Sequence, residues 1–317
     1  MECSHSREPS PNGIVVLNKP SGITSASAVH RLKRSLELSK RYSVGHSGTL
    51  DPMATGVLVC LVGKATKLAS SFSDASKQYS GRMRFGIRTS TDDIEGEVLE
   101  TLNAGVAPDF NTILSYTREF QGEILQVPPS VSAIRVNGER AYRRVLRGED
   151  VKIVARKVQV DLFEIFETED PWEVSFRIQC GSGTYIRSLA RDLGERLGVG
   201  GCLASLQRDV VGPFSLRESI CLEEISPAVG LRHWSDGFLE LPEVIIGERH
   251  LAALCHGRDA YSPIQGDFGD RTIVRFAREQ AFRSEGLLEL RDHAWKIRYI
   301  SPEVRESVME NSGRVHE

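Results

Sequence analysis

The residues with the clearest chemical potential lie in a glycine-rich loop. Residues 45–56 contain one imidazole, His46, and one carboxylate, Asp51, and they run into an apolar segment at residues 57–63. A rigid strand that carries such a loop is a common way to hold a reactive side chain in place. Pro52 disfavours helical backbone for the residue before it, so Asp51 is biased toward an extended conformation. We interpret Asp51 as a nucleophile.

Two other interpretations fit the same loop. Asp followed by Pro is also a good helix start, with Asp51 as the N-cap and Pro52 as the first helical residue. Local sequence on its own favours this capping role. The aspartyl-phosphate loop of phosphatases and ion pumps also contains a Thr-Gly-Thr-Leu-like string, but its aspartate precedes the small residues. Here Asp51 follows Thr49 and Leu50, which argues against phosphoryl transfer.

Three further segments have patterns that admit a chemical role. Tyr79 begins an alternating segment, residues 77–86, that predicts a half-buried strand, where a tyrosine is most often a core residue. Arg187 falls in the first turn of a predicted helix, where a cation opposes the helix dipole, so it is either a surface residue or the partner of an anion. Residues 125–157 are the densest basic region, which suits either an arm that touches RNA phosphates or a solvated surface.

These segments together resemble one family. Residues 45–56 read Gly-His-Ser-Gly-Thr-Leu-Asp-Pro-Met-Ala-Thr-Gly, which is similar to the signature loop of the TruB family of tRNA pseudouridine synthases. Ser47 and Met53 depart from the usual Thr and Leu but keep a hydroxyl and an apolar side chain. Other family motifs recur at residues 77–79 with 86–93, 129–142, 183–187 and 202–214. The resemblance extends over roughly residues 13–220.

The resemblance implies a role for each matching residue. Asp51 is the nucleophile, Arg187 pairs with it, and Tyr79 lies against the target base, where its ring stacks and its hydroxyl reaches a proton. Six residues are implied to contact the substrate, as pocket wall, neighbour of the base or RNA contact: His46, Lys67, Arg135, Tyr185, Leu206 and Arg208. Arg135 stands where Lys is usual, and Asp209 stands in a neighbourhood that is normally more basic.

Two more residues match the family without an assigned catalytic step. Lys19 belongs to a Lys-Pro turn that is implied to support the catalytic loop. Asp93 matches the acid of the second motif, although a turn-capping role is equally natural for it.

The implied reaction is the isomerisation of uridine to pseudouridine at position 55, in the T-arm of tRNA. The base detaches at N1, turns and reattaches at C5, with no cofactor. The nucleophilic carboxylate must be ionised, and a nearby arginine lowers the pKa of an aspartate, which is the role expected of Arg187. The sequence leaves open whether Asp51 attacks C6 of the base or C1′ of the ribose. The target base must first flip out of the RNA. His46 then either fills the vacated space or contacts the RNA loop, unless it is an ordinary loop histidine.

The elements that must position these residues indicate an α+β protein. We expect a pseudouridine-synthase fold, a mixed and largely antiparallel central sheet flanked by helices, followed by a small C-terminal PUA-like β-domain. The patterns predict strands at residues 13–19, 77–86 and 172–180, and helices over residues 25–36 and 185–197, with Thr24 and Thr184 as N-caps. We expect a flexible N-terminus (1–12), a catalytic domain (13–240) with an RNA-gripping insertion (about 124–152), and the small RNA-binding domain (241–317).

Composition restricts the remaining function classes. The net charge of −3 over 317 residues does not by itself indicate nucleic-acid binding, so any RNA contact must rest on local patches. The six cysteines form no Cys-x-x-Cys pair and the eight histidines show no metal-ligand spacing, so we expect reduced thiols and no metal. We expect a cytoplasmic monomer without a membrane segment that acts on the tRNA T-arm stem-loop. A non-catalytic tRNA chaperone and a synthase within a guide-RNA complex remain alternatives.

Overall fold

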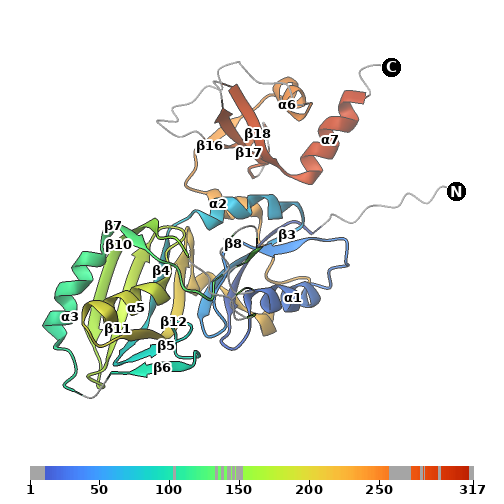
Figure 1. Ribbon diagram of the computed structural model, residues 1–317. Coiled ribbons are helices and arrows are strands. Elements are labelled where there is room, and N and C mark those ends of the chain that lie inside the picture. Colours follow the sequence, from blue (N-terminus) through green and yellow to red (C-terminus); the bar gives the residue numbers. More distant parts are fainter. Residues whose placement is uncertain are drawn as a thin grey trace.

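The computed structural model describes residues 11–102, 105–132, 135–136, 139–140, 144, 147, 153–256, 273–278, 281, 283–291 and 294–313. Within these residues the chain forms one large sheet, one smaller sheet and two hairpins, with helices packed against both sheets (Figure 1). The α+β class predicted from the sequence is confirmed.

The large sheet brings together strands from the first two thirds of the chain. Its ten described strands are β1 (Gly13–Lys19), β2 (Val44–His46), β3 (Thr55–Val62), β4 (Lys77–Phe85), β7 (Gly122–Gln126), β10 (Arg156–Glu167), β11 (Glu173–Cys180), β12 (Gly201–Val211), β13 (Phe214–Ser215) and β14 (Ile220–Cys221). The two hairpins are β5 (Ile87–Thr89) with β6 (Val98–Thr101) and β8 (Arg135–Val136) with β9 (Glu139–Arg140).

A short parallel contact between β3 and β12 joins the two halves of the large sheet. The strand order is β14-β1-β3-β12-β4-β11-β10-β7, with β2 beside β3 and β13 beside β12. Among the described strand pairs of this large sheet, only β1–β14 and β3–β12 are parallel. Gly56 lies in the β3–β12 contact with a φ of 101°, and a Cβ there would lie 2.3 Å from the backbone oxygen of Arg208. Only glycine permits this approach of the two strands.

Helices and 3₁₀ turns cover the large sheet. The α-helices are α1 (Ser25–Ser35), α2 (Ala69–Ser73), α3 (Phe110–Thr117) and α5 (Ile186–Arg196). The 3₁₀ turns are η1 (Gly63–Leu68), η2 (Arg118–Phe120), η3 (Leu216–Glu218), η4 (Leu222–Glu224) and η5 (Trp234–Phe238).

Strand β3 is buried on both faces. Residues on one face pack in a cluster with α1, namely Leu58, Cys60 and Val62 with Ala28 and Leu32. Residues on the other face pack with η1, α2 and η5, namely Val57, Val59 and Leu61 with Leu68, Phe72 and Trp234. A strand buried on both faces reads as a continuous apolar run, as residues 57–62 do. The loop that carries Asp51 therefore leads into a strand that is buried along almost its whole length.

The C-terminal part forms the smaller sheet. Its described elements are β15 (Glu243–Ile245), α6 (Glu248–Cys255), β16 (Ile273–Ala277), β17 (Gly286–Arg291), β18 (Ala294–Ile300) and α7 (Pro302–Gly313). This sheet packs on the large one through Tyr299, whose ring lies 4.9 Å from that of Trp234 and whose hydroxyl accepts a 2.8 Å hydrogen bond from Asn12. The domain boundary near residue 241 and the PUA-like character of this part stay predictions.

Most predicted elements are confirmed, one predicted N-cap is wrong, and the alternative helix start at Asp51 does not occur. Thr24 caps α1 by accepting a hydrogen bond from the backbone N–H of Ser27. No helix begins at Asp51, because the loop continues directly into β3. The N-cap of α5 is Tyr185 rather than Thr184, whose hydroxyl donates instead to the carbonyl oxygen of Gly181. None of the helices in the described ranges is long and apolar enough to cross a membrane.

Candidate active site

A pocket of about 640 Å³ opens beside the β3–β12 contact. Asp51 and Arg187, which are 136 positions apart in the chain, both line it. Seven of the nine site residues predicted from the sequence line this pocket: His46, Asp51, Tyr79, Tyr185, Arg187, Leu206 and Arg208. The catalytic loop, β4, α5 and β12 each contribute to the wall.

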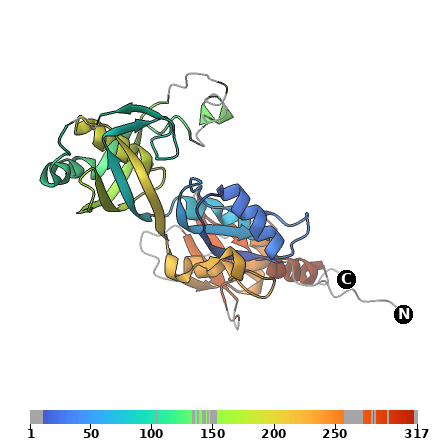
Figure 2. The ribbon, with the colours of Figure 1, turned by 90° about the horizontal axis from the view of Figure 1, so that it is seen from below.

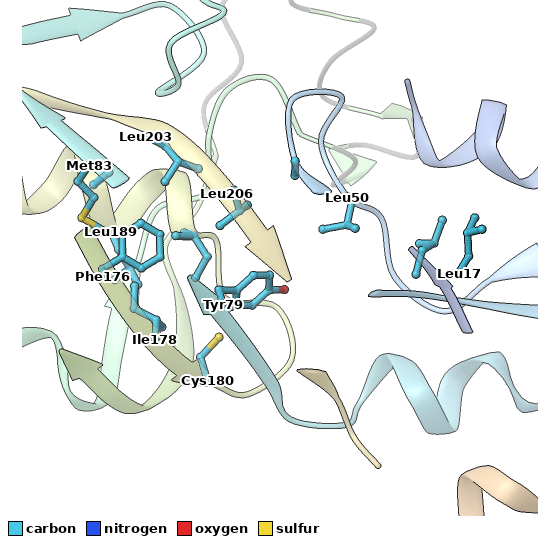
Figure 3. Packing of buried hydrophobic residues seen from close by; sticks show 14 of the residues in the cluster. Leu17, Leu50, Tyr79, Met83, Phe176, Ile178, Cys180, Leu189, Leu203 and Leu206 are labelled. Carbon is cyan, nitrogen blue, oxygen red and sulfur yellow. The ribbon is translucent and has the colours of Figure 1, made fainter. Parts of the chain in front are cut away.

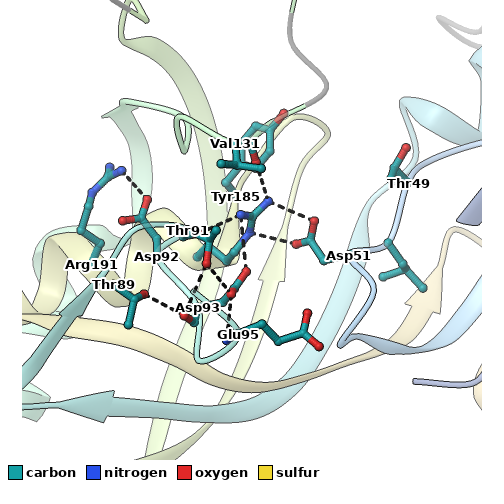
Figure 4. Close-up of polar contacts among 12 residues, drawn as sticks. Thr49, Asp51, Thr89, Thr91, Asp92, Asp93, Glu95, Val131, Tyr185 and Arg191 are labelled. Carbon is teal, nitrogen blue, oxygen red and sulfur yellow. Dashed lines mark hydrogen bonds and ion pairs between the residues drawn. The ribbon is translucent and has the colours of Figure 1, made fainter. Parts of the chain in front are cut away.

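Two nitrogens of Arg187 contact the carboxylate of Asp51. Its Nη2 donates to Oδ1 at 3.0 Å, and its Nε lies 2.9 Å from Oδ2. The side chain of Arg187 is 5% exposed, whereas that of Asp51 keeps 30% exposure. Figure 4 shows Asp51 at the edge of a polar network that also contains Thr91 and Asp93. A paired carboxylate with an open face can meet an electrophile without first losing its partner.

Further acceptors fix the orientation of the Arg187 guanidinium. Nη1 donates to the carbonyl oxygen of Thr91 at 2.8 Å and lies 3.5 Å from Oδ2 of Asp93. Nη2 also donates to the carbonyl oxygen of Val131 at 3.1 Å, at the start of the predicted RNA-gripping insertion. Asp93 accepts from the Thr91 hydroxyl at 2.6 Å and from the backbone N–H of Glu95 at 3.2 Å, so it caps a turn and faces Arg187 at once.

A second ion pair lies beside the first and was missed by the sequence reasoning. Arg191, one turn after Arg187 on α5, pairs with Asp92 at 2.9 Å and donates to the carbonyl oxygen of Val127 at 2.8 Å. Two arginines spaced i, i+4 therefore face two consecutive aspartates. That spacing on one helix face, together with the adjacent Asp92 and Asp93, is the signal that predicts such a ladder.

Side chains from the first 25 residues hold the backbone on both sides of Asp51. The hydroxyl of Ser25 donates to the carbonyl oxygen of Leu50 at 3.0 Å and accepts from its N–H at 2.8 Å. Lys19 is fully buried, and its ammonium donates to the carbonyl oxygens of Pro20, Ile23 and Pro52 at 2.8, 2.8 and 3.2 Å. Burial lowers the pKa of Lys19 to about 8.

Arg208 also holds the backbone of the loop that carries Asp51, through hydrogen bonds from its guanidinium. Its side chain is buried, with 3% of the residue exposed. Nε donates to the carbonyl oxygen of Val57 at 2.8 Å, and Nη2 and Nη1 donate to those of Gly48 and Thr49 at 3.1 and 3.5 Å. Arg208 lines the pocket, but its guanidinium is engaged by the loop backbone. Its predicted role as an RNA contact stays a prediction.

Burial decides the ionisation of Asp51. The pKa of its carboxyl is raised above the ordinary value because burial disfavours the charged form. Arg187 lowers this pKa, as the sequence predicts, while Asp93 raises it further. The predicted lowering by Arg187 is present, but the net shift of the Asp51 pKa is upward, because the loss of hydration outweighs the attraction of Arg187. The arginine limits the rise instead of reversing it.

The other pocket residues offer a surface for a flat ring. Tyr79 lies at the end of the apolar cluster next to Leu206, and its hydroxyl points away from Met83 and Phe176 (Figure 3). Burial raises the pKa of the Tyr79 hydroxyl, and Arg208 opposes that rise. The Tyr185 ring lies under the Arg156 guanidinium, 5.0 Å from it. The Nδ1 of His46 accepts a 3.4 Å hydrogen bond from the N–H of Gly48.

Two predicted substrate contacts are not placed in this pocket. Lys67 is exposed in η1 and lines a separate groove, together with Lys64, Arg41 and two glutamates of α7. The backbone of Arg135 lies in β8, and its side chain is outside the described residues. In the described part of the chain, no group of three His, Cys, Asp or Glu side chains could hold a metal ion.

The fold and the sequence were compared with known proteins. A solved structure described as the crystal structure of a Cbf5-Nop10-Gar1 complex matches with a TM-score of 0.66 and 26% identity, over 91% of this chain and 84% of that chain. The family described as TruB family pseudouridylate synthase (N terminal domain) matches residues 33–186. A relative in Arthrobacter sp. (strain FB24), named tRNA pseudouridine synthase B, is 43% identical over 78% of this chain and 81% of its own. A relative with the same name in Mycobacterium leprae (strain TN) is 40% identical over 88% of this chain and 90% of its own.

These likenesses and the geometry of the site agree on one class. The chain has the fold of a pseudouridine synthase, an isomerase, and its mixed sheet presents an arginine-bound aspartate, a tyrosine and an apolar wall in one pocket. Within that class, the chain belongs to the TruB family of pseudouridylate synthases.

Proposed function

We propose that this enzyme isomerises uridine to pseudouridine in tRNA, at position 55 of the T-arm, with Asp51 as the nucleophile and without a cofactor. The relatives named tRNA pseudouridine synthase B support tRNA as the substrate. The observation that supports the proposed site most directly is the contact of two Arg187 nitrogens with the carboxylate of Asp51, which stays open to the pocket.

The reaction follows from what the pocket residues can do. The target uridine flips out of the RNA at a cost of a few kcal/mol and enters the pocket, where Tyr79 and Leu206 face its ring. Asp51 forms a bond to C6 of the base or to C1′ of the ribose as the bond from N1 to C1′ breaks. The base turns and C5 bonds to C1′. In the C1′ route, the bond from Asp51 to C1′ breaks as C5 bonds to C1′; in the C6 route, the bond from Asp51 to C6 breaks afterwards. C5 loses its proton and N1 gains one, and the carboxylate of Asp51 is regenerated.

Arg187 keeps the nucleophile usable. A buried carboxylate tends to take up a proton, and a protonated Asp51 cannot attack. The guanidinium opposes this and also fixes the direction of the carboxylate through its own bonds to Thr91 and Val131. Tyr79 has its hydroxyl at the same pocket and is the proposed group for moving the proton at C5.

The test uses the isolated chain and an unmodified tRNA transcript labelled with tritium at C5 of uridine. Isomerisation at C5 releases the label to water, so the expected result is one equivalent released per tRNA and none when position 55 is cytidine. Release from other uridines, with position 55 untouched, would refute the T-arm site. No release at all, with tRNA still bound, would favour the chaperone alternative.

The same assay addresses assembly. We propose a monomer that needs no guide RNA, so the purified chain alone should act on a T-arm stem-loop. Activity that appears only when another protein or a guide RNA is added would favour the guide-RNA alternative.

A further inference from the structure

Helix α1 presents an exposed face that carries cations and no carboxylate. The helix sequence from residues 25 to 35 contains no Asp or Glu, and its buried residues are Ser25, Ala28 and Leu32. The opposite side exposes Ala26, His30, Arg31 and Arg34. At 100° per residue, positions 26, 30 and 34 form one line along the helix and position 31 lies next to it. We call these four residues the α1 face.

The arginines of the α1 face have no ion-pair partner within the described residues, whereas several other exposed arginines are paired. Elsewhere on the surface Arg82, Arg88, Arg177 and Arg196 each meet a glutamate, at 3.5, 3.0, 3.5 and 3.0 Å. No such pair involves Arg31 or Arg34. A protein with a net charge of −3 has enough carboxylates to neutralise this helix, yet α1 contains none of them.

The α1 face begins at the active site. Thr24, Ser25 and Ala26 line the same pocket as Asp51, and the Ser25 hydroxyl is bonded to Leu50 in the catalytic loop. At a rise of about 1.5 Å per residue, Arg31 lies roughly 8 Å and Arg34 roughly 12 Å beyond Ala26 along the helix. In Figure 2, the β8–β9 hairpin (light green) lies above α1 (dark blue).

We propose that the α1 face binds the phosphate backbone of the tRNA next to the flipped uridine. The small side chain of Ala26 lets the RNA come close at the pocket, and Arg31 and Arg34 neutralise phosphates as the strand leaves it. Cations without internal partners gain the most from such contacts, because no ion pair has to break and counterions leave the RNA. This proposal rests on the proposed function, since it takes the pocket as the place where the RNA strand enters.

The experiment measures tRNA affinity against salt for the wild type and two double variants. The test variant is Arg31→Gln with Arg34→Gln. The matched control is Arg177→Gln with Arg196→Gln, which removes the same charge from arginines that are paired with Glu164 and Glu119. Each lost phosphate contact lowers the slope of log K against log salt by about 0.7 to 0.9, so the test variant should lose about 1.4 to 1.8.

The expected result has three further parts. Binding by the test variant weakens roughly 10-fold or more at 0.1 M salt, because each contact contributes close to one decade there. Turnover at saturating tRNA stays within about twofold, since neither arginine reaches the pocket. A T-arm stem-loop shows the same change of slope, because Arg34 is only about 12 Å from the pocket along the helix.

The outcomes separate this proposal from the proposed function. If the test variant keeps the wild-type salt slope, or changes no more than the control, the α1 face does not bind RNA, even if the wild type makes pseudouridine normally. If the wild type makes no pseudouridine but the test variant shows the expected smaller slope of log K against log salt, the proposed function is wrong and the α1 face is still supported as an RNA-binding surface. Thermal unfolding of both variants establishes that the fold is intact in each comparison.

Discussion

The loop that carries Asp51 is held differently on its two sides. On the carboxylate side, Arg187 forms ion pairs with Asp51 and Asp93, so the contacts there are between opposite charges. On the backbone side, Ser25 and Arg208 bond backbone groups of the residues before Asp51 and do not touch its carboxylate. The first region affects the ionisation of Asp51, and the second fixes the position of its backbone. Lys19 belongs to both, because it bonds the loop and its charge also lowers the pKa of Asp51.

This difference predicts two kinds of variant. Changes on the carboxylate side should move the pH dependence of the rate, whereas changes on the backbone side should lower the rate and leave the pH dependence in place. The measurement that separates them is kcat/KM between about pH 4.5 and 8, whose acid limb reports the ionisation of an essential base or nucleophile in the free enzyme.

The largest effect is expected for Asp51→Asn. An amide cannot replace the nucleophilic carboxylate, so turnover should fall by about 10⁴-fold or more. The affinity for tRNA should change less than about threefold, because the RNA contacts lie elsewhere. The control is Asp109→Asn, at the exposed N-cap of α3, where Asn caps as well as Asp and activity should be unchanged. Residual turnover within tenfold of the wild type would rule out Asp51 as the nucleophile.

Arg187→Gln should cause the next largest effect and should show the charge role directly. Burial raises the pKa of Asp51 and Arg187 lowers it, so losing the arginine raises this pKa further. The enzyme needs ionised Asp51, and the acid limb of kcat/KM must therefore move to higher pH. The rate near pH 7 should fall by about 10²-fold or more.

Arg187→Lys keeps a cation and should return part of the acid limb toward its original position. Both substitutions leave Asp93 without its arginine, and removing one partner of a buried pair costs about 3–5 kcal/mol of stability. Urea unfolding measures that cost separately. An acid limb that stays fixed in both variants would contradict the charge role.

Arg208→Gln tests the opposite side of the comparison. The guanidinium bonds the carbonyl oxygens of Gly48, Thr49 and Val57, and it does not contribute to the raised pKa of Asp51. Loosening the loop by about 1 Å should cost roughly 10²-fold in kcat. The acid limb should not move. If the acid limb moves as far as in Arg187→Gln, Arg208 also controls the ionisation of Asp51, which contradicts the proposed difference between the two sides of the loop.

The sequence predicts the partners in this site better than their energetics. Residues 77–86 alternate, and β4 indeed buries Tyr79, Met83 and Phe85. The contact of Arg187 with Asp51 follows from the resemblance of two distant motifs. The sign of the Asp51 pKa shift does not, because the sequence shows a neighbouring charge but not how much water the fold removes.

Other features depend on tertiary packing that no local pattern reports. The resemblance implies a substrate contact for Arg208, but it does not show that the approach of β12 to Gly56 places the guanidinium against the loop carbonyls. Helix α7 was not predicted, since only Val304 and Val308 of its described side chains fall in the buried apolar cluster. Two apolar positions make a weak periodic signal.

The smallest expected effect belongs to Ser25→Ala. This change removes one hydroxyl that both donates to and accepts from Leu50, so the N–H and the carbonyl oxygen of Leu50 each lose a partner. Leaving such buried groups unpaired should lower the free energy of unfolding by about 1–3 kcal/mol. The loop next to Asp51 should also loosen, which lowers kcat several-fold without moving the acid limb.

Ser27→Ala, on the same helix, is the matched control for that change. The N–H of Ser27 bonds the Thr24 hydroxyl and is kept by alanine, so its stability should stay within about 0.5 kcal/mol of the wild type. Urea unfolding and kcat/KM profiles of the two variants give the comparison. If Ser25→Ala behaves like Ser27→Ala in both measurements, the loop is held by Lys19 and Arg208 without help from α1. The backbone side would then consist of Lys19 and Arg208 only. Because Lys19 also lowers the pKa of Asp51, only Arg208 would hold the loop without affecting the charge of Asp51.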